Sequence, residues 1–189
     1  MFDDIKELFR GILRPIAKKF VAVNPNTLTI SGLGVSLISA FFFARNEAFI
    51  GGALLLLSGF FDAFDGIVAR ENKRITRFGG FLDSVCDRFA DAAVIIGVMY
   101  GGLAAFPQFP EWFFGGLALV GSLMVSYTRA RAEAAGGSAE VGFGNRAIRL
   151  LILVAGAFLG MVNWAILLIA ALSFITVFQR ISHVRKTLK

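Results

Sequence analysis

Six apolar stretches divide this chain, and they constrain its fold more than any other feature. They cover residues 28–44, 48–70, 80–104, 113–134, 146–162 and 163–180. Each is close to the ~20 residues that a helix needs to cross a ~30 Å hydrocarbon core. Hydrophobic residues make up 57% of the chain, well above the roughly 45–50% of a soluble domain. The pattern predicts an all-α integral membrane protein in which one domain, residues 1–189, contains a six-helix transmembrane bundle over residues 25–180.

Prolines and a polar pair mark two of the breaks between these stretches. Pro107 and Pro110 interrupt the segment between the third and the fourth stretch. Asn163 and Trp164 predict a tight turn between the last two, at a membrane interface where an indole ring is favourable.

Basic residues occur in alternate loops and predict the orientation. They gather in residues 6–19, 70–77, 129–149 and 180–189, which six spans place on one side, whereas Arg45 alone lies on the other side. Cytoplasmic loops of membrane proteins carry such an excess of Lys and Arg. The sequence therefore predicts a multi-pass protein of the cell membrane with both termini cytoplasmic. The net charge of +6 then reflects this bias, and a nucleic-acid partner is not expected for so apolar a chain.

The first 22 residues have the pattern of a helix but are not apolar for long enough to span a membrane. Their apolar residues recur at steps of three and four, and they are Phe2, Ile5, Leu8, Phe9, Ile12 and Ile16. Lys and Arg lie between them, which favours an amphipathic helix in the cytoplasmic interface, in contact with membrane lipid. A solvated helix that packs on the protein is the alternative, and Pro25 ends either helix.

Five aspartates lie inside the second and third apolar stretches, where an ionised carboxylate costs at least a few kcal/mol. Asp62 and Asp65 are three residues apart, and Asp83 and Asp87 are four apart, so each pair shares one helix face. Adjacent antiparallel helices bring the two pairs together near the cytoplasmic surface. Four converging carboxylates repel one another without cations, and hard oxygen ligands suit Mg²⁺ or Mn²⁺. Asp91 lies one turn deeper, and both a structural and a functional role stay open for it.

The competing interpretation is that these aspartates form salt bridges with nearby arginines. The candidates in the same region are Arg70, Arg74, Arg77 and Arg88. Two pairs of spaced carboxylates on facing helices favour the metal site instead. Gly66, Gly79 and Gly80 lie in the same region, and a backbone without a Cβ can approach a bulky diphosphate closely.

Residues 62–87 read DAFDGIVARENKRITRFGGFLDSVCD, which is D-x2-D-G-x2-A-R-x8-G-x3-D-x3-D. This segment resembles the signature of the CDP-alcohol phosphatidyltransferase family at each specified position. Residues 25–29, Pro-Asn-Thr-Leu-Thr, are similar to the segment that begins the first span in that family. The resemblance implies six spans, an interfacial N-terminal helix and a homodimer.

The resemblance also implies a role for each matched residue. Asp62, Asp65 and Asp83 would ligate two Mg²⁺ or Mn²⁺ ions, and Asp87 would both ligate metal and act as the general base. The CDP-linked lipid would contact a further set of residues, namely Asn26, Thr29, Asp62, Gly66, Arg70 and Thr76. The implied reaction transfers a lipid phosphate from the CDP-linked lipid to an alcohol and releases CMP.

The segment between the fourth and fifth stretches bears on the identity of the alcohol. It contains Arg129, Arg131, Arg146 and Arg149, and an arginine fork suits a phosphate group because it donates bidentately. Ordinary positive-inside charge is the competing interpretation. S-Y-x-[RK]-A-R-A-E followed by R-x2-R resembles the inositol-phosphate-accepting branch of the family. That resemblance implies myo-inositol phosphate as the acceptor, with its phosphate bound by Arg129, Arg149 and Arg180.

Several alternatives remain open at this point. Glycerol 3-phosphate, another phosphorylated polyol, would use the same arginines. An ion-coupled transporter would place its carboxylates near the bilayer midplane on broken helices, and a catalytically silent scaffold would not need the complete signature. The sequence does not distinguish diacylglycerol from archaeol as the lipid, or Mg²⁺ from Mn²⁺.

Overall fold

Each of the six apolar stretches forms one helix in the computed structural model, which describes residues 23–188. Within that range the chain has no strand, and its helices are α2 (Pro25–Ala44), α3 (Ala48–Glu71), α4 (Arg77–Tyr100), α5 (Phe113–Ala134), α6 (Arg146–Phe158) and α7 (Val162–Thr187). The predicted interfacial helix over residues 1–22 lies outside the described residues. The fold class is therefore all-α, as the apolar pattern predicts.

Four of these helices are long and apolar enough to cross a membrane, and they are α2, α3, α5 and α7. Helix α6 has 13 residues, about 20 Å at the usual rise of ~1.5 Å per residue. Helix α4 is long enough with 24 residues, but its aspartates and arginines lower its apolar character. The described part of the chain thus has several apolar helices consistent with a multi-pass membrane protein, while the count of six spans stays a prediction.

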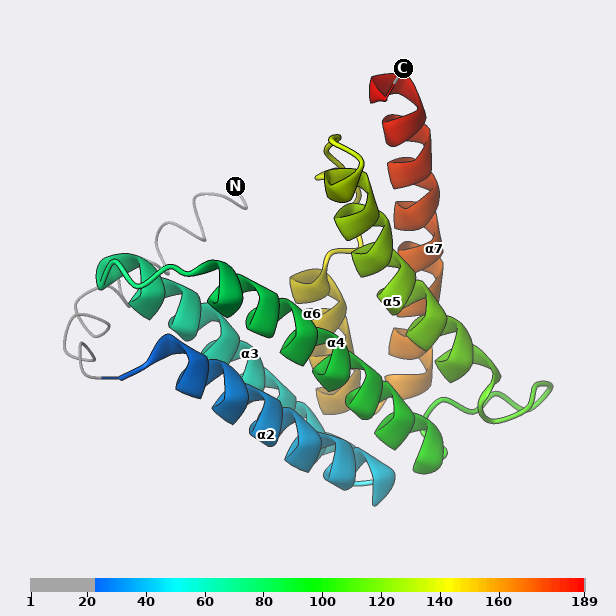
Figure 1. Cartoon of the computed structure of the whole chain (residues 1–189). Helices are drawn as coiled ribbons and strands as arrows, with labels where there is room; N and C mark the ends of the chain where they lie inside the picture. Colours follow the sequence, from blue (N-terminus) through cyan, green and yellow to red (C-terminus); the bar gives the residue numbers. More distant parts are fainter. Residues whose placement is uncertain (1–22, 189) are drawn as a thin grey trace.

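The helices form two groups that α6 joins. Helix α2 packs against α3 and α4, α5 packs against α7, and α6 contacts both α3 and α7. Figure 1 shows α3 and α4 alongside α2, with α5 and α7 on the opposite side of α6. Large apolar side chains such as Phe41, Phe81 and Phe89 lie on the outside, each about 60% exposed or more. An exterior of this kind is expected where lipid rather than water is the solvent.

Three helices begin at the same end of the molecule, and a side chain caps each of them. The side chains of Asn24, Thr76 and Asn145 accept hydrogen bonds from backbone amides in the first turns of α2, α4 and α6. Helices α3, α5 and α7 begin at the opposite end without a side-chain cap bond. The end that carries the caps is the end where the aspartates of α3 and α4 lie. Capping satisfies amides that a helix start leaves unpaired, so these starts are fixed beside the candidate site.

The turn between the last two helices is not where the sequence pattern places it. Asn163 and Trp164 lie inside the first turn of α7, so the predicted turn at this pair is wrong. The chain reverses at Gly160 instead, whose φ of +68° is left-handed and is available to glycine at no steric cost. A second glycine, Gly102 at φ +69°, follows the end of α4, which is shorter than the predicted stretch to residue 104.

Helices α2 and α4 approach one another through a glycine. A Cβ on Gly97 would lie 2.3 Å from the backbone oxygen of Ala40, which is well inside contact distance. Since the blocking atom belongs to the backbone of α2, neither helix can yield by a change of rotamer.

We expect Gly97→Ala to destabilise the protein because the added methyl group must push α2 and α4 apart. Overpacking of this kind costs about 1–3 kcal/mol, and each kcal/mol corresponds to a fall in Tm of about 2–4 °C in a chain of this size. Thermal unfolding in detergent measures the effect. The matched control is Gly34→Ala in α2, where an added Cβ meets nothing within 4 Å. An equal Tm for the two variants would contradict close packing at Gly97.

Candidate active site

Three of the five aspartates converge from α3 and α4, two helices that both pack against α2. Asp62, Asp83 and Asp87 each offer an oxygen, and these oxygens lie within 4.8 Å of one another. Asp65 lies beside this cluster but is not part of it. It is buried, at 6% exposure, and its Oδ2 accepts a hydrogen bond of 2.5 Å from Oγ1 of Thr29 in α2. The i,i+3 and i,i+4 spacings thus bring the aspartates to one region, but the three-carboxylate cluster takes one residue from α3 and two from α4.

This donor set fits a divalent cation. Carboxylate oxygens are the hard ligands that Mg²⁺ and Mn²⁺ prefer. Oδ1 of Asp83 is buried and has no hydrogen-bond donor in the described part of the chain. A buried acceptor without a partner carries an uncompensated desolvation cost, which a bound cation would offset.

An arginine from α6 also reaches into the cluster. Nη1 of Arg146 lies 2.9 Å from Oδ2 of Asp62 and 2.8 Å from Oδ1 of Asp87, and Nε lies 3.3 Å from Oδ1 of Asp91. The salt-bridge interpretation of the sequence named other arginines as partners, namely Arg70, Arg74, Arg77 and Arg88. Of those four, Arg88 is the one with such a contact among the described ion pairs, at 3.7 Å from Asp87. Sequence reasoning missed Arg146 as a partner of the aspartates, although its R-x2-R spacing places it on one helix face with Arg149.

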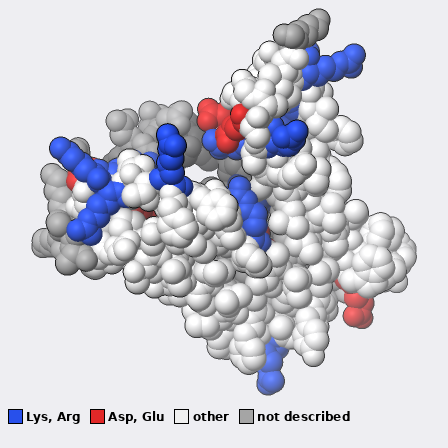
Figure 2. All heavy atoms as spheres, viewed as in Figure 1, with Lys and Arg blue, Asp and Glu red and all other residues white. Residues whose placement is uncertain are grey.

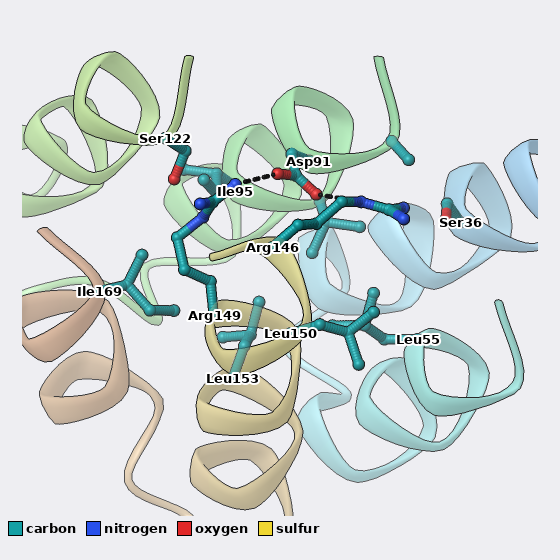
Figure 3. A pocket seen from close by; sticks show the side chains of 12 residues that line it. Ser36, Leu55, Asp91, Ile95, Ser122, Arg146, Arg149, Leu150, Leu153 and Ile169 are labelled. Atoms are coloured by element: carbon teal, nitrogen blue, oxygen red, sulfur yellow. Dashed lines mark hydrogen bonds and ion pairs between the residues drawn. The ribbon is translucent and has the colours of Figure 1, made fainter. Parts of the chain in front are cut away.

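Asp91 connects the cluster to a second arginine. Its Oδ2 lies 2.8 Å from Nη2 of Arg149, while its Oδ1 faces Arg146. Figure 3 shows Asp91 between the two arginines, which reach it from α6. Arg149 is 4% exposed, and its Nη1 donates to the carbonyl of Gly144 at 2.7 Å. The contacts of Asp91 therefore tie α4 to the first turn of α6.

A pocket of about 220 Å³ opens next to the carboxylates. Its lining comes from the first turns of α2 and α4 and the last turns of α3, and includes Asn26, Thr29, Asp65, Gly66, Arg70, Thr76, Gly79 and Asp83. Five of the six residues that the sequence assigns to the CDP-lipid lie here. The sixth, Asp62, lines a small adjoining cavity with Asp65, Asp87 and Arg146.

Glycine gives this pocket its close backbone contacts. A Cβ on Gly66 would lie 3.3 Å from Nη2 of Arg70, so the guanidinium rests against the helix backbone. The amide of Gly79 donates to Oγ1 of Thr76 at 2.9 Å. The pocket therefore brings together the guanidinium of Arg70, two helix starts and two carboxylates.

The three arginines predicted to bind the acceptor phosphate come from α5, α6 and α7. Arg129 is exposed and pairs with Glu133 at 2.9 Å and Glu140 at 3.2 Å. Arg180 is 6% exposed and donates to the backbone oxygens of Val125 and Val141. Arg129 and Arg149 are both near enough to repel the positive guanidinium of Arg180.

Burial separates two of these three arginines from ordinary loop charges. Arg149 and Arg180 are both more than nine-tenths buried, so positive-inside bias at a solvated surface does not explain them. Figure 2 shows other Lys and Arg side chains on either side of a recess at this end of the molecule, with blue almost absent from the opposite end.

The sequence model of the CDP-alcohol phosphatidyltransferase family matches residues 22–177. The chain belongs to this family. It is thus an enzyme of the transferase class, and the family assignment made from the residue 62–87 signature is confirmed.

The relatives of this CDP-alcohol phosphatidyltransferase include inositol-phosphate enzymes. It is 39% identical to an archaetidylinositol phosphate synthase of Methanothermobacter thermautotrophicus, over 100% of this chain and 96% of that protein. It is 35% identical to a phosphatidylinositol phosphate synthase of Mycobacteroides abscessus, over 95% of this chain and 86% of that protein. Two crystal structures of the Mycobacterium tuberculosis phosphatidylinositol phosphate synthase share its fold.

Those two structures were solved with different ligands. One contains manganese and citrate, with a TM-score of 0.83 at 33% identity, and the match covers 92% of this chain and 88% of that one. The other contains CDP-DAG, with a TM-score of 0.82 at 33% identity, and covers 94% and 95%. Manganese, the metal in the first structure, is an ion that carboxylate oxygens such as those of Asp62, Asp83 and Asp87 suit.

We expect Asp83→Asn to weaken Mn²⁺ binding, because the substitution removes the charge of a carboxylate whose buried oxygen has no other partner. Loss of an outer partner of a metal site typically costs about 10–100-fold in affinity, and loss of a direct ligand costs at least as much. Electron paramagnetic resonance of free Mn²⁺ measures the affinity. Glu140→Gln on the exposed loop is the control, and an equal affinity for both variants would exclude Asp83 as a ligand.

Proposed function

We propose that this enzyme transfers the lipid phosphate of a CDP-linked lipid to myo-inositol phosphate and releases CMP. The observation that carries the proposal is the three-carboxylate cluster of Asp62, Asp83 and Asp87 at the edge of a polar pocket of about 220 Å³. Relatives that match nearly the whole chain are synthases of archaetidylinositol phosphate and phosphatidylinositol phosphate. They support an inositol phosphate as acceptor and either CDP-archaeol or CDP-diacylglycerol as donor.

The aspartates divide the chemistry between them. Asp62, Asp83 and Asp87 would hold a divalent ion, Mg²⁺ or Mn²⁺, and Asp65 beside them would help to hold a second. The bound ions supply Lewis-acid polarisation of the diphosphate and neutralise the charge on the leaving CMP. Asp87 accepts the proton of the acceptor hydroxyl as that oxygen attacks the lipid-linked phosphorus. The new P–O bond forms as the bond to CMP breaks, and CMP leaves with the bonding electrons.

The pocket beside the cluster takes the donor headgroup. Asn26, Thr29 and Thr76 supply polar groups at the starts of α2 and α4, and Arg70 lies over Gly66 in α3. Helix starts carry a partial positive charge and unpaired amides, which favour phosphate oxygens. The diphosphate would therefore lie between the starts of α2 and α4, on the side of the aspartates that faces this pocket, Asp65 and Asp83.

The acceptor phosphate lies on the side of α5, α6 and α7. Arg129 and Arg149 both lie near enough to Arg180 to act on it electrostatically, and charge-assisted hydrogen bonds from arginine are the strong ones for phosphate. Glycerol 3-phosphate carries the same group and is the alternative acceptor. The names of the relatives favour inositol phosphate over it.

We further propose that all six described helices cross the membrane as one domain, with residues 1–22 at the cytoplasmic interface. The helices alternate in direction, and loops 72–76 and 135–145 lie at the same end as the aspartates. This end then faces the cytoplasm together with both termini, and a homodimer is the expected assembly. Helix α6 is short for a full span, and its contacts with α3 and α7 place other helices rather than lipid beside part of it.

A panel of acceptors tests the reaction with the purified full-length chain in detergent. CMP release is measured with CDP-linked lipid, Mg²⁺ and each of inositol phosphate, glycerol 3-phosphate, serine and inositol. We expect turnover with inositol phosphate, and a fall in kcat of about 10²–10⁴-fold in Asp87→Asn, which is the usual contribution of a general base. Turnover with glycerol 3-phosphate alone would overturn the acceptor. Absence of CMP with every acceptor would overturn the proposed reaction.

Arg129→Ala refines the acceptor assignment. We expect it to raise the KM for inositol phosphate by about tenfold or more, since a hydrogen bond to a charged group contributes ~1.5–3 kcal/mol, while the KM for the CDP-linked lipid stays unchanged. Arg131→Ala, an exposed arginine two residues along the same helix, is the matched control. Equal effects of the two substitutions would point to general surface charge rather than to a phosphate contact.

Cysteine labelling tests the orientation, because the native Cys86 is the chain's one cysteine and is buried. Single cysteines are introduced at Ser138 in loop 135–145 and at Gln108 in loop 101–112, both exposed positions. In intact cells we expect a membrane-impermeant maleimide to label the Gln108→Cys variant and not the Ser138→Cys variant. The reverse labelling pattern would overturn the cytoplasmic location of the active site.

A further inference from the structure

Arg146 has contacts that neither the signature nor the acceptor site accounts for. Its Nη1 bridges Asp62 on α3 and Asp87 on α4 at 2.9 and 2.8 Å. These two residues supply oxygens to the three-carboxylate cluster that fits a divalent cation. A guanidinium and a metal ion that share these carboxylates repel one another, so binding of one weakens binding of the other.

The backbone that carries Arg146 is fixed. The amide of Gly144 donates to Oγ1 of Thr176 at 2.8 Å, and its carbonyl accepts from Nη1 of Arg149 at 2.7 Å. A Cβ on Gly144 would lie 2.8 Å from that Oγ1 and 2.9 Å from the oxygen of Leu172. The cap by Asn145 then begins α6. Any adjustment between guanidinium and metal therefore takes place in the long side chain of Arg146 rather than in its backbone.

Asp91 gives the guanidinium a second anion outside the cluster. Its Oδ1 lies 3.3 Å from Nε of Arg146, and its Oδ2 is held by Arg149 at 2.8 Å. Asp91 thus keeps part of the Arg146 charge on the side away from Asp83. A neutral residue at this position would leave Asp62 and Asp87 as the anions nearest to the guanidinium.

We propose that Arg146 is a positioning residue that shares the carboxylates of Asp62 and Asp87 with the divalent metal, so that Arg146 and Asp91 together set the metal affinity. Arg146 lowers this affinity by competing for the two carboxylates. Asp91 raises it by drawing the guanidinium away from them. This inference rests on the proposed metal-binding role of Asp62, Asp83 and Asp87.

The test is Mn²⁺ binding to the full-length chain in detergent, followed by electron paramagnetic resonance without substrate. We expect Arg146→Gln to bind Mn²⁺ about tenfold more tightly, within the usual range of coupling between two binding events, and Arg146→Lys to remain close to the wild type. Asp91→Asn should have the opposite effect and weaken Mn²⁺ binding. Thermal unfolding adds a second readout, since Arg146→Gln should gain more in Tm from Mn²⁺ than the wild type does.

Two controls make the result decisive. Arg88→Gln removes another positive charge near Asp87, where Nη1 lies at the longer distance of 3.7 Å. If Arg88→Gln tightens Mn²⁺ binding as much as Arg146→Gln does, the effect is one of general charge and the proposal is overturned. Unchanged or weaker binding in Arg146→Gln overturns it as well. If Asp83→Asn binds Mn²⁺ as tightly as the wild type does, the proposed metal site itself is overturned, and with it the inference.

Discussion

The arrangement of α3, α4 and α6 depends on how negative charge is compensated inside a membrane protein. Five aspartates lie on α3 and α4, and carboxylates at such short separation repel one another strongly where water is scarce. Arg146 and Arg149 enter from α6, and Asp91 alternates with them, so that opposite charges follow one another from Asp62 to Arg149. The same contacts hold α6 against both helices. Even with Arg88, Arg146 and Arg149 counted, the acids remain in excess, which leaves a net negative site that favours a divalent cation.

Polar structure is concentrated at the end of the bundle that carries this charge. The capped starts of α2, α4 and α6 lie there, together with the buried arginines that bind loop carbonyls between α5 and α6. The rest of the bundle packs through apolar side chains and close glycine contacts such as Gly97 against Ala40. A rigid apolar frame thus positions a polar site at one end of the bundle. Catalysis of phosphoryl-type transfer asks the protein chiefly for alignment and electrostatic stabilisation, which such a frame provides.

The lengths of the apolar stretches and the loops between them were sufficient to predict the six helices. A membrane-spanning helix needs about 20 consecutive apolar residues, and this property can be read from a single segment of the sequence. These features did not predict the turn at Gly160, where the chain reverses through a left-handed φ. The polar pair Asn163–Trp164 led to a turn being predicted inside the first turn of α7 instead. The aspartate spacings predicted which carboxylates share a helix face. They did not predict that Asp65 lies outside the three-carboxylate cluster and accepts a hydrogen bond from Thr29. That position depends on the rotation of α3 relative to α2 and α4. Arg146 was missed as a partner of Asp62 because the two residues are far apart in sequence and meet only through the packing of α6 on α3.

The carboxylate of Asp91 couples the proposed metal site to the proposed acceptor-phosphate site. Arg146 contacts the proposed metal ligands and Arg149 belongs to the proposed phosphate site, and each holds one oxygen of Asp91. If a bound phosphate drew Arg149 towards itself, the ion pair between Arg149 and Asp91 would weaken and Asp91 would attract Arg146 more strongly. Arg146 would then move away from Asp62 and Asp87, and their oxygens would be freer to hold metal. Because linkage between two binding events is reciprocal, metal binding would in turn strengthen the binding of the acceptor phosphate. Both ligands would thus favour the fully assembled site over either partly filled one, through side chains that are already in contact.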